Sequence, residues 1–336
     1  MSDKVLKVKN LAVVFKSRER KVHAVRGVDI EVNEGEIVGI VGESGSGKSV
    51  AMKAVIGILA DNASLSADVL TMGDKNLNNL SEREYQKIRG KDITMIFQDP
   101  MTALNPVIRV GKQLEEVIVR NSALSKKEAG EKALEMLERV GIPFPKESSK
   151  RYPHEFSGGM RQRVLIAMAL SCNPKLLIAD EPTTALDVTI QAQVLDLIKT
   201  MSKDAGTSVI LITHDLGVVA ETCDRVVIMY GGLVMETGSI EEIFYKPKHP
   251  YTMALLQAIP SIDMDEGERL KSIEGFPPSL IDPPKGCPFA ERCEFRMDIC
   301  SSKRPPLKAF SKTHTSMCFL NEEELEHAFR RQKYGK

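Results

Sequence analysis

The sequence has no excess of charge of either sign, because its 336 residues include 46 Lys and Arg and 46 Asp and Glu. Proteins that bind nucleic acid in general usually carry a basic excess, so the composition argues against a nucleic-acid partner. The chain also lacks an apolar run of the ~18 residues that a membrane-spanning helix needs. Its first residues, Met1–Lys4, lack the apolar core of a signal peptide. We therefore expect a cytosolic chain that works at a membrane only as a peripheral protein, held on the cytoplasmic face by a partner.

Alternating strand and helix patterns predict an α/β fold. Apolar and β-branched runs predict strands at 5–15, 23–32, 36–41, 176–179 and 209–213. Helices are expected at 49–59 and 189–201, and after the capping boxes that open at Ser81 and Ser125. Strand–helix–strand alternation is typical of a mainly parallel sheet whose faces are both covered.

The length and the proline pattern predict more than one part. A chain of 336 residues exceeds the usual size of a single core. Residues 100–165 are predicted to form a helical insertion, and prolines punctuate the chain beyond about residue 240. We predict a main domain over 1–240, with a helical subdomain at about 100–165, and a C-terminal extension over 241–336.

A glycine-rich turn follows the strand at 36–41. Residues 42–49, GESGSGKS, fit the phosphate-binding pattern G-x-x-x-x-G-K-[ST]. The glycines let backbone N–H groups face an anion, and the helix that starts at Lys48 adds its positive dipole end. Lys48 is expected to reach the β- and γ-phosphates of ATP and Ser49 to hold Mg²⁺. Because a strand precedes the turn and a helix follows it, nucleotide binding is favoured over a chance match. The contacts with the nucleotide are expected from Gly42, Ser44, Gly45, Gly47, Lys48 and Ser49.

Two further strand ends carry polar side chains that suit hydrolysis. The apolar strand at 176–179 runs into Asp180, which belongs near Mg²⁺ in a phosphate-loop fold, and Glu181 is the candidate base that activates water. The alternative for Glu181 is an acid that caps a helix N-terminus. The strand at 209–213 is followed by His214, for which a structural role is the alternative to a catalytic one.

Residues 156–163, FSGGMRQR, place a serine and two glycines before a helix predicted at 162–170. Such a helix end can bind an anion, and the alternative interpretation is a surface helix whose N-terminus the serine only caps. The segment resembles the signature motif of the ABC ATPases, which binds the ATP held by a second subunit. The resemblance therefore implies a head-to-tail dimer in which Ser157, Gly158 and Gly159 contact the other subunit's ATP.

The resemblance to ABC ATPases covers about residues 5–240, because several motifs recur in the family's order. The matches are Walker A (Lys48, Ser49), Walker B with the catalytic glutamate (Asp180, Glu181), the Q-loop (Gln98), the D-loop (185–187, with Asp187), the switch histidine (His214) and the adenine-stacking aromatic (Phe15).

What the resemblance implies is a P-loop ABC ATPase with a RecA-like core, an antiparallel β subdomain and a helical subdomain. Gln98 would sense Mg²⁺ and the transmembrane partner, and His214 would contact the γ-phosphate. For Phe15 a core position is the alternative. Met160 stands where many family members have glutamine, and we expect activity to survive because the phosphate contacts come from Ser157 and glycine backbone.

Four of the six cysteines crowd the end of the chain, with the spacing Cys287-x₅-Cys293-x₆-Cys300-x₁₇-Cys318. In a reducing compartment, clustered thiols favour a metal over disulfides, and plain buried cysteines are the alternative. Zinc sites usually show pairs spaced by two to four residues, which are missing here, so a 4Fe–4S cluster is preferred to zinc. Nearby basic residues were expected to offset the charge of such a cluster: Lys285, Arg292, Arg296, Lys303 and Arg304.

The extension and the Q-loop resemble one branch of the family, the ATP-binding subunits of dipeptide and oligopeptide importers, which also includes nickel importers. The resemblance is carried by 249–252 (HPYT), the four-cysteine segment and 97–106 (FQDPMTALNP). It implies a second ABC ATPase subunit, as a heterodimer, two transmembrane permease subunits and a substrate-binding protein. Nickel or another small solute is the alternative cargo. A soluble ABC ATPase that acts outside transport is the competing function.

Overall fold

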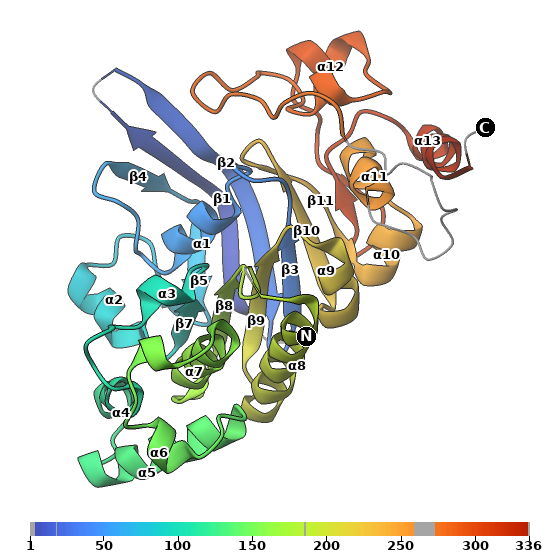
Figure 1. Cartoon of the computed structure of the whole chain (residues 1–336). Helices are drawn as coiled ribbons and strands as arrows, with labels where there is room; N and C mark the ends of the chain where they lie inside the picture. Colours follow the sequence, from blue (N-terminus) through green and yellow to red (C-terminus); the bar gives the residue numbers. More distant parts are fainter. Residues whose placement is uncertain (1–3, 18, 185, 259–272, 335–336) are drawn as a thin grey trace. The chain divides into compact units, whose positions relative to one another are not determined.

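The computed structural model describes residues 4–17, 19–184, 186–258 and 273–334 (Figure 1). The described chain divides into two compact units. The first unit is mainly Asn79–Ile212. The second combines Lys7–Glu31, Val38–Asn78 and the described residues from Thr213 onward.

Three parallel strands of an eight-stranded sheet lie in the first unit. The central strand β8 (Leu176–Asp180) pairs in parallel with β7 (Ile93–Ile96) and with β9 (Ser208–Thr213). Every residue of β8 and β9 is buried. Strands buried on both faces read as continuous apolar runs, which is why the runs at 176–179 and 209–213 were recognisable. Both strand predictions are confirmed.

Helices make up the rest of the first unit. They are α2 (Glu82–Ile88), α3 (Pro100–Ala103), α4 (Val110–Asn121), α5 (Lys126–Arg139), α6 (Pro145–Ser148), the 3-10 helix η1 (Pro153–Glu155), α7 (Gly158–Leu170) and α8 (Val188–Ala205). The predicted capping boxes are present at Ser81 and Ser125. At the second box, the Ser125 backbone N–H donates to the Glu128 carboxylate at 2.8 Å. These caps satisfy backbone donors that a helix start otherwise leaves without partners.

An antiparallel sheet occupies the N-terminal part of the second unit. Its strands are β1 (Lys4–Lys16), β2 (Lys21–Asn33), β4 (Ala63–Ser66), β5 (Val69–Met72) and β6 (Lys75–Asn76), in the order β2-β1-β5-β6 with β4 beside β1. The predicted strands at 5–15 and 23–32 are confirmed. The predicted helix at 49–59 is shorter in the structure, where α1 spans Lys48–Val55. It ends before Gly57, because the φ of 70° at Gly57 is incompatible with a right-handed helix.

The other strands of the eight-stranded sheet belong to this unit and include part of the C-terminal extension. Strand β10 (Arg225–Tyr230) runs parallel to β3 (Ile37–Val41) and antiparallel to β11 (Leu233–Ser239). Strand β13 (Thr315–Ser316) pairs with β11, and β12 (Lys308–Ala309) pairs with β13. The chain beyond residue 240 therefore returns to the edge of this sheet.

The helices of the second unit, besides α1, are α9 (Leu216–Thr222), α10 (Ile240–Tyr245), α11 (Pro250–Gln257), the 3-10 helix η2 (Ala290–Arg292), α12 (Asp298–Ser302) and α13 (Glu322–Tyr334). Within the described ranges, none of the helices combines the length and the apolar character needed to cross a membrane.

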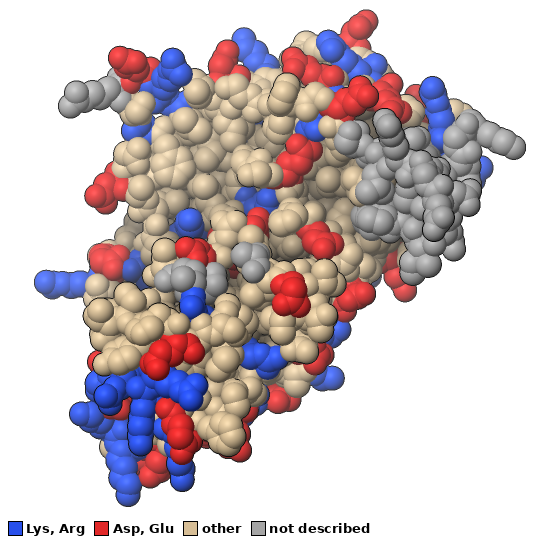
Figure 2. Space-filling model, viewed as in Figure 1, with Lys and Arg blue, Asp and Glu red and all other residues tan. Residues whose placement is uncertain are grey.

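Charged side chains of both signs occur on the visible face of the protein. Figure 2 shows Lys and Arg gathered over α4 and α5, with Asp and Glu among them. Some of these charges pair along a helix, such as Lys112 with Glu115 at 3.4 Å and Lys132 with Glu135 at 3.7 Å. Such exposed pairs contribute little stability and leave a mixed, solvated surface.

Candidate functional site

The predicted phosphate loop connects β3 with α1 and curls around the Lys48 ammonium group. Lys48 is buried, and its Nζ donates to the carbonyl oxygens of Gly42 at 2.7 Å and of Glu43 at 2.9 Å. An anion held by the loop would meet this ammonium together with the N-terminus of α1. Ser49 lies in the first turn of the same helix. The geometry is thus that of a phosphate-binding loop.

Glycines are required in this loop for two physical reasons. A Cβ atom on Gly42 would overlap the carbonyl oxygen of Met229, and one on Gly47 would overlap the carbonyl oxygen of Ala24. Gly45 has free space around it but a φ of 77°, in the left-handed region that glycine populates without strain. The loop therefore lies against other backbone segments that leave no room for side chains at Gly42 and Gly47.

The candidate base Glu181 follows β8 and is held by two side chains of the first unit. Its Oε2 accepts hydrogen bonds from Gln98 Nε2 at 2.7 Å and from Thr184 Oγ1 at 3.0 Å. Its backbone adopts a φ of 47°, which is strained for a residue with a side chain. Such strain is characteristic of functional sites. Asp180, the residue before it, is buried.

The signature segment and the D-loop lie together in the first unit. Ser157 is the N-cap of α7, and its Oγ accepts a hydrogen bond from Met160 N at 3.3 Å. Asp187 caps α8 in the same way, through a 3.0 Å bond from Ile190 N. A Cβ atom on Gly159 would lie 2.8 Å from Ile190 Cγ2, so the glycine permits close approach of α7 to the start of α8. Ser157 and Asp187 are both exposed.

The predicted nucleotide-site residues are divided between the two units. The first unit carries Gln98, Ser157, Gly158, Gly159, Asp180, Glu181 and Asp187, and the second carries Phe15, His214 and the phosphate loop. His214 is exposed just after β9, and Phe15 is half-buried in β1 opposite Ala63 of β4. Ala185 of the D-loop lies outside the described residues. Their individual catalytic roles stay predictions.

The four clustered cysteines line one small cavity in the second unit. The cavity has a volume of about 20 Å³ and is also lined by His249 and Phe289. This is room for about one water molecule. Burial raises the pKa of Cys287 and Cys293 to about 12 and that of Cys318 to about 11, so these thiols are neutral at physiological pH. The pKa of His249 falls to about 3, also because of burial.

The metal prediction finds limited support in this geometry. In the part of the chain that the structure describes, no group of three or more His, Cys, Asp or Glu residues is arranged to hold a metal ion. The residues fit a thiolate-bound group in kind and in number, as four thiols around one cavity. The structure supports neither the 4Fe–4S cluster nor zinc beyond that.

Arg292 has a contact that the sequence did not reveal. Its Nη1 donates to both carboxylate oxygens of Glu43, at 2.9 and 2.8 Å. Glu43 is the second residue of the phosphate loop, so Arg292 has a carboxylate partner there in addition to the role near a metal cluster that the sequence suggested. Both residues carry charges of suitable sign, but no sequence signal links positions 249 apart.

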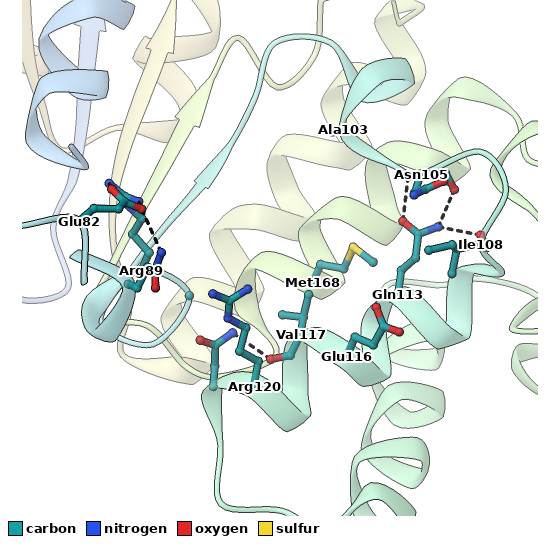
Figure 3. Close-up of a pocket in the computed structure, with 13 residues that line it drawn as sticks. Glu82, Arg89, Ala103, Asn105, Ile108, Gln113, Glu116, Val117, Arg120 and Met168 are labelled. Atoms are coloured by element: carbon teal, nitrogen blue, oxygen red, sulfur yellow. Dashed lines mark hydrogen bonds and ion pairs between the residues drawn. The ribbon is translucent and has the colours of Figure 1, made fainter. Parts of the chain in front are cut away.

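A larger cavity of about 620 Å³ lies in the first unit, among α2, α4 and the segment that follows α3 (Figure 3). On one side of it Gln113 Nε2 donates to the carbonyl oxygens of Asn105 at 2.9 Å and Ile108 at 2.8 Å. On another side Arg89 pairs with Glu82 at 2.7 Å. These bonds hold the walls in place, so the cavity is preformed. One of its lining residues, Ala103, follows Gln98 in the sequence by five positions.

Comparisons with known proteins agree with this site. A family model described as "ABC transporter" matches residues 25–184, and a second, described as "Oligopeptide/dipeptide transporter, C-terminal region", matches residues 235–300. A solved structure of the ATP-binding cassette MJ0796, a dimer in a post-hydrolysis state bound to ADP and Pi, is 29% identical. It aligns over 70% of this chain and 98% of its own with a TM-score of 0.61.

Two relatives match almost the whole chain. The dipeptide transport ATP-binding protein DppD of Bacillus subtilis is 52% identical over 97% of both chains. The oligopeptide transport ATP-binding protein OppD of Escherichia coli is 50% identical over 96% of this chain and 95% of its own. Fold and site thus define an ABC ATPase, an enzyme that hydrolyses ATP. Within that class, the chain belongs to the family of ATP-binding subunits of dipeptide and oligopeptide transporters.

Proposed function

We propose that this ATPase powers the import of dipeptides or oligopeptides through a membrane ABC transporter. The observation that carries the proposal is the match of residues 235–300 to the C-terminal region of oligopeptide and dipeptide transporters, since the cassette alone does not specify a cargo. The relatives that match over nearly the whole chain carry peptide-transport names, which adds support. The domain assignment proposed with it is a nucleotide-binding domain at 1–240 and an extension at 241–336.

The proposed hydrolysis mechanism assigns a role to each strand-end residue. Ser49, Gln98 and Asp180 would hold Mg²⁺, which would supply positive charge to neutralise the phosphates. Glu181 orients and deprotonates the attacking water, because Gln98 and Thr184 fix its carboxylate. Lys48 stabilises the charge on the transferring phosphoryl group, with loop N–H groups.

Further contacts complete the proposed nucleotide site. His214 contacts the γ-phosphate, and Phe15 stacks on adenine. The backbone of Gly42, Ser44, Gly45 and Gly47 wraps the phosphates.

The proposed working form is a dimer in which each ATP lies between the Lys48 loop of one subunit and the Ser157 segment of the other. Ser157 and Asp187 are exposed and carry no large side chains that would keep a second subunit away. Val188 beside them is 84% exposed and would be covered by the second subunit in this arrangement. We propose a second, different ABC ATPase as the other subunit.

We propose that the large cavity of the first unit receives a permease subunit. Its lining mixes apolar and charged residues, and Val107, which lies in the sequence between the lining residues Asn105 and Ile108, is 77% exposed. A permease segment bound there would report its state through the Gln98 loop to Glu181. This contact would hold the chain as a peripheral protein on the cytoplasmic face, with the substrate-binding protein reached through the permease.

A 4Fe–4S cluster ligated by Cys287, Cys293, Cys300 and Cys318 is proposed with a structural or docking role, and zinc is the alternative. The support is a set of four thiols around one cavity. A single zinc ion draws its sulfurs together, at Zn–S bonds of about 2.3 Å, whereas a cluster spreads them further apart. The preference for the cluster comes from the sequence, whose cysteine spacing lacks the close pairs of most zinc sites.

Iron, zinc and acid-labile sulfide are to be assayed in anaerobically purified protein. Iron with sulfide is expected in the unchanged chain and in Cys172→Ser, whose thiol lies outside the cavity, and is lost in Cys300→Ser. Zinc without iron or sulfide would contradict the cluster.

The transport proposal is tested in cells that lack this chain and are supplied with labelled dipeptides, longer peptides and nickel. Loss of peptide uptake alone supports the proposal, and loss of nickel uptake alone would replace the cargo. Pull-down from detergent extracts should recover membrane proteins. Recovery of ribosomes or nucleic acid instead would favour the soluble function.

A further inference from the structure

The second residue of the phosphate loop, Glu43, is held from two sides. Its backbone carbonyl accepts the Lys48 ammonium at 2.9 Å, and its backbone N–H donates to the hydroxyl of Tyr251 at 3.1 Å. Its carboxylate points to Arg292. Every polar group of Glu43 therefore takes part in fixing the loop.

An uncompensated carboxylate at this position would weaken phosphate binding. Glu43 lies next to Gly42, whose carbonyl also binds the Lys48 ammonium, so its carboxylate belongs to the loop that is proposed to hold the phosphates. Like charges repel more strongly in a partly buried site than in water. The Arg292 guanidinium removes this repulsion by pairing with the carboxylate at 2.8 Å.

Arg292 is itself rigidly placed. Its side chain is only 6% exposed, and besides Glu43 it donates to the Tyr230 hydroxyl at 3.0 Å. Its remaining nitrogens donate to the backbone carbonyls of Glu274 at 2.8 Å and Ile273 at 2.9 Å. A guanidinium with this many partners has one orientation, so the charge is presented to Glu43 in a fixed place.

The segment that carries Arg292 also packs under the loop. Phe289 packs against both Tyr230 and Tyr251, with ring centroids 5.5 and 5.1 Å away. The turn at Gly231 approaches Pro288 so closely that an added Cβ would lie 2.9 Å from the proline ring. The next residue of that turn, Gly232, donates to the carbonyl of Ser46 in the phosphate loop at 3.1 Å.

We propose that Arg292 is a positioning residue for ATP binding, which acts through Glu43 by neutralising its carboxylate and fixing the phosphate loop. The four-cysteine segment thereby contributes to the nucleotide site of its own subunit. This role rests on the proposed phosphate loop and is independent of the cargo and of any metal.

The test measures MgATP affinity with a fluorescent ATP analogue, and KM and kcat for hydrolysis, in full-length variants. Arg292→Met should raise the dissociation constant about tenfold, a typical size for coupling between two sites. Adding Glu43→Gln removes the repelling charge, so the double variant Glu43→Gln/Arg292→Met should bind more tightly than Arg292→Met alone. A purely structural role predicts the opposite, because each substitution would then only remove contacts.

Arg296→Met is the matched control, since Arg296 lies in the same segment and bonds to Ser301 at 2.8 Å. It should stay within about twofold of the unchanged chain. Equal affinities in Arg292→Met and Arg296→Met, or no recovery in the double variant, would overturn the proposal.

Arg292→Gln is a second neutral variant for the case that Arg292→Met does not fold. Failure of both to fold would assign Arg292 to folding and overturn the proposal. Lys48→Ala tests the phosphate-loop assignment separately from the role of Arg292. If this variant binds MgATP normally, the phosphate loop itself is misassigned.

Discussion

Gly47, the last residue before α1, allows the geometry of the phosphate loop to be tested with one methyl group. Its φ is 98°, and a Cβ atom there would overlap the carbonyl oxygen of Ala24. Gly45, two residues earlier, has a similar φ of 77° but nothing within 4 Å of an added Cβ. Alanine at either position meets the same backbone penalty, and only Gly47→Ala adds a collision.

The expected magnitudes follow from this difference. A left-handed conformation costs an L-residue about 1–2 kcal/mol, which both variants share. In Gly47→Ala the loop must also move away from Ala24, and this shifts the N–H groups that face the phosphates. Losing one hydrogen bond to a charged group corresponds to about 1.5–3 kcal/mol. We therefore expect MgATP affinity to fall at least about tenfold further in Gly47→Ala than in Gly45→Ala.

The assay is calorimetric titration of MgATP, with thermal unfolding of each variant recorded beside it. Gly73→Ala is the control for the cost of placing alanine in a left-handed conformation. Gly73 has a φ of 52° and open space around it, and it lies outside the phosphate loop. It should lower the unfolding temperature slightly and leave ATP affinity unchanged. Equal affinities in Gly45→Ala and Gly47→Ala would refute the argument that close packing against Ala24 sets the loop geometry.

Three further variants test separate parts of the proposed function. Glu181→Gln should leave MgATP affinity unchanged while turnover falls about 10²–10⁴-fold, the usual contribution of a general base, as measured by phosphate release. Hydrolysis at the unchanged rate would refute the base assignment. Val188→Glu should abolish ATP-dependent association with the second ATPase subunit in light scattering, because it adds a charge at the proposed subunit interface. ATP binding by the single chain should be retained. Val107→Glu should keep that association but lose co-purification with the permease, so the two valines serve as controls for each other.

Local signals made much of this fold predictable. Continuous apolar runs identified β8 and β9, since strands buried on both faces need apolar residues at every position. Reciprocal Ser–Glu spacing identified the helix starts at Ser81 and Ser125. The prediction for α1 ran too long, because the apolar residues continue past the Gly57 turn that ends the helix.

Contacts between distant positions were not predictable in the same way. The Arg292–Glu43 pair joins residues 249 apart, and neither residue type nor spacing indicates which of the basic residues of the segment reaches the loop. The bond from Gln98 to Glu181 spans 83 residues, and the resemblance to the family named both residues without predicting this bond. The four cysteines were recognised as a group from their spacing, and their common cavity is a result of the fold.

The central claim is that ATP hydrolysis at this site drives peptide import. The most direct measurement is peptide uptake in cells whose only copy of this chain carries Glu181→Gln. The account predicts that uptake of labelled peptides is lost although the variant is present in normal amounts and still binds ATP. Unchanged peptide uptake in those cells would contradict it.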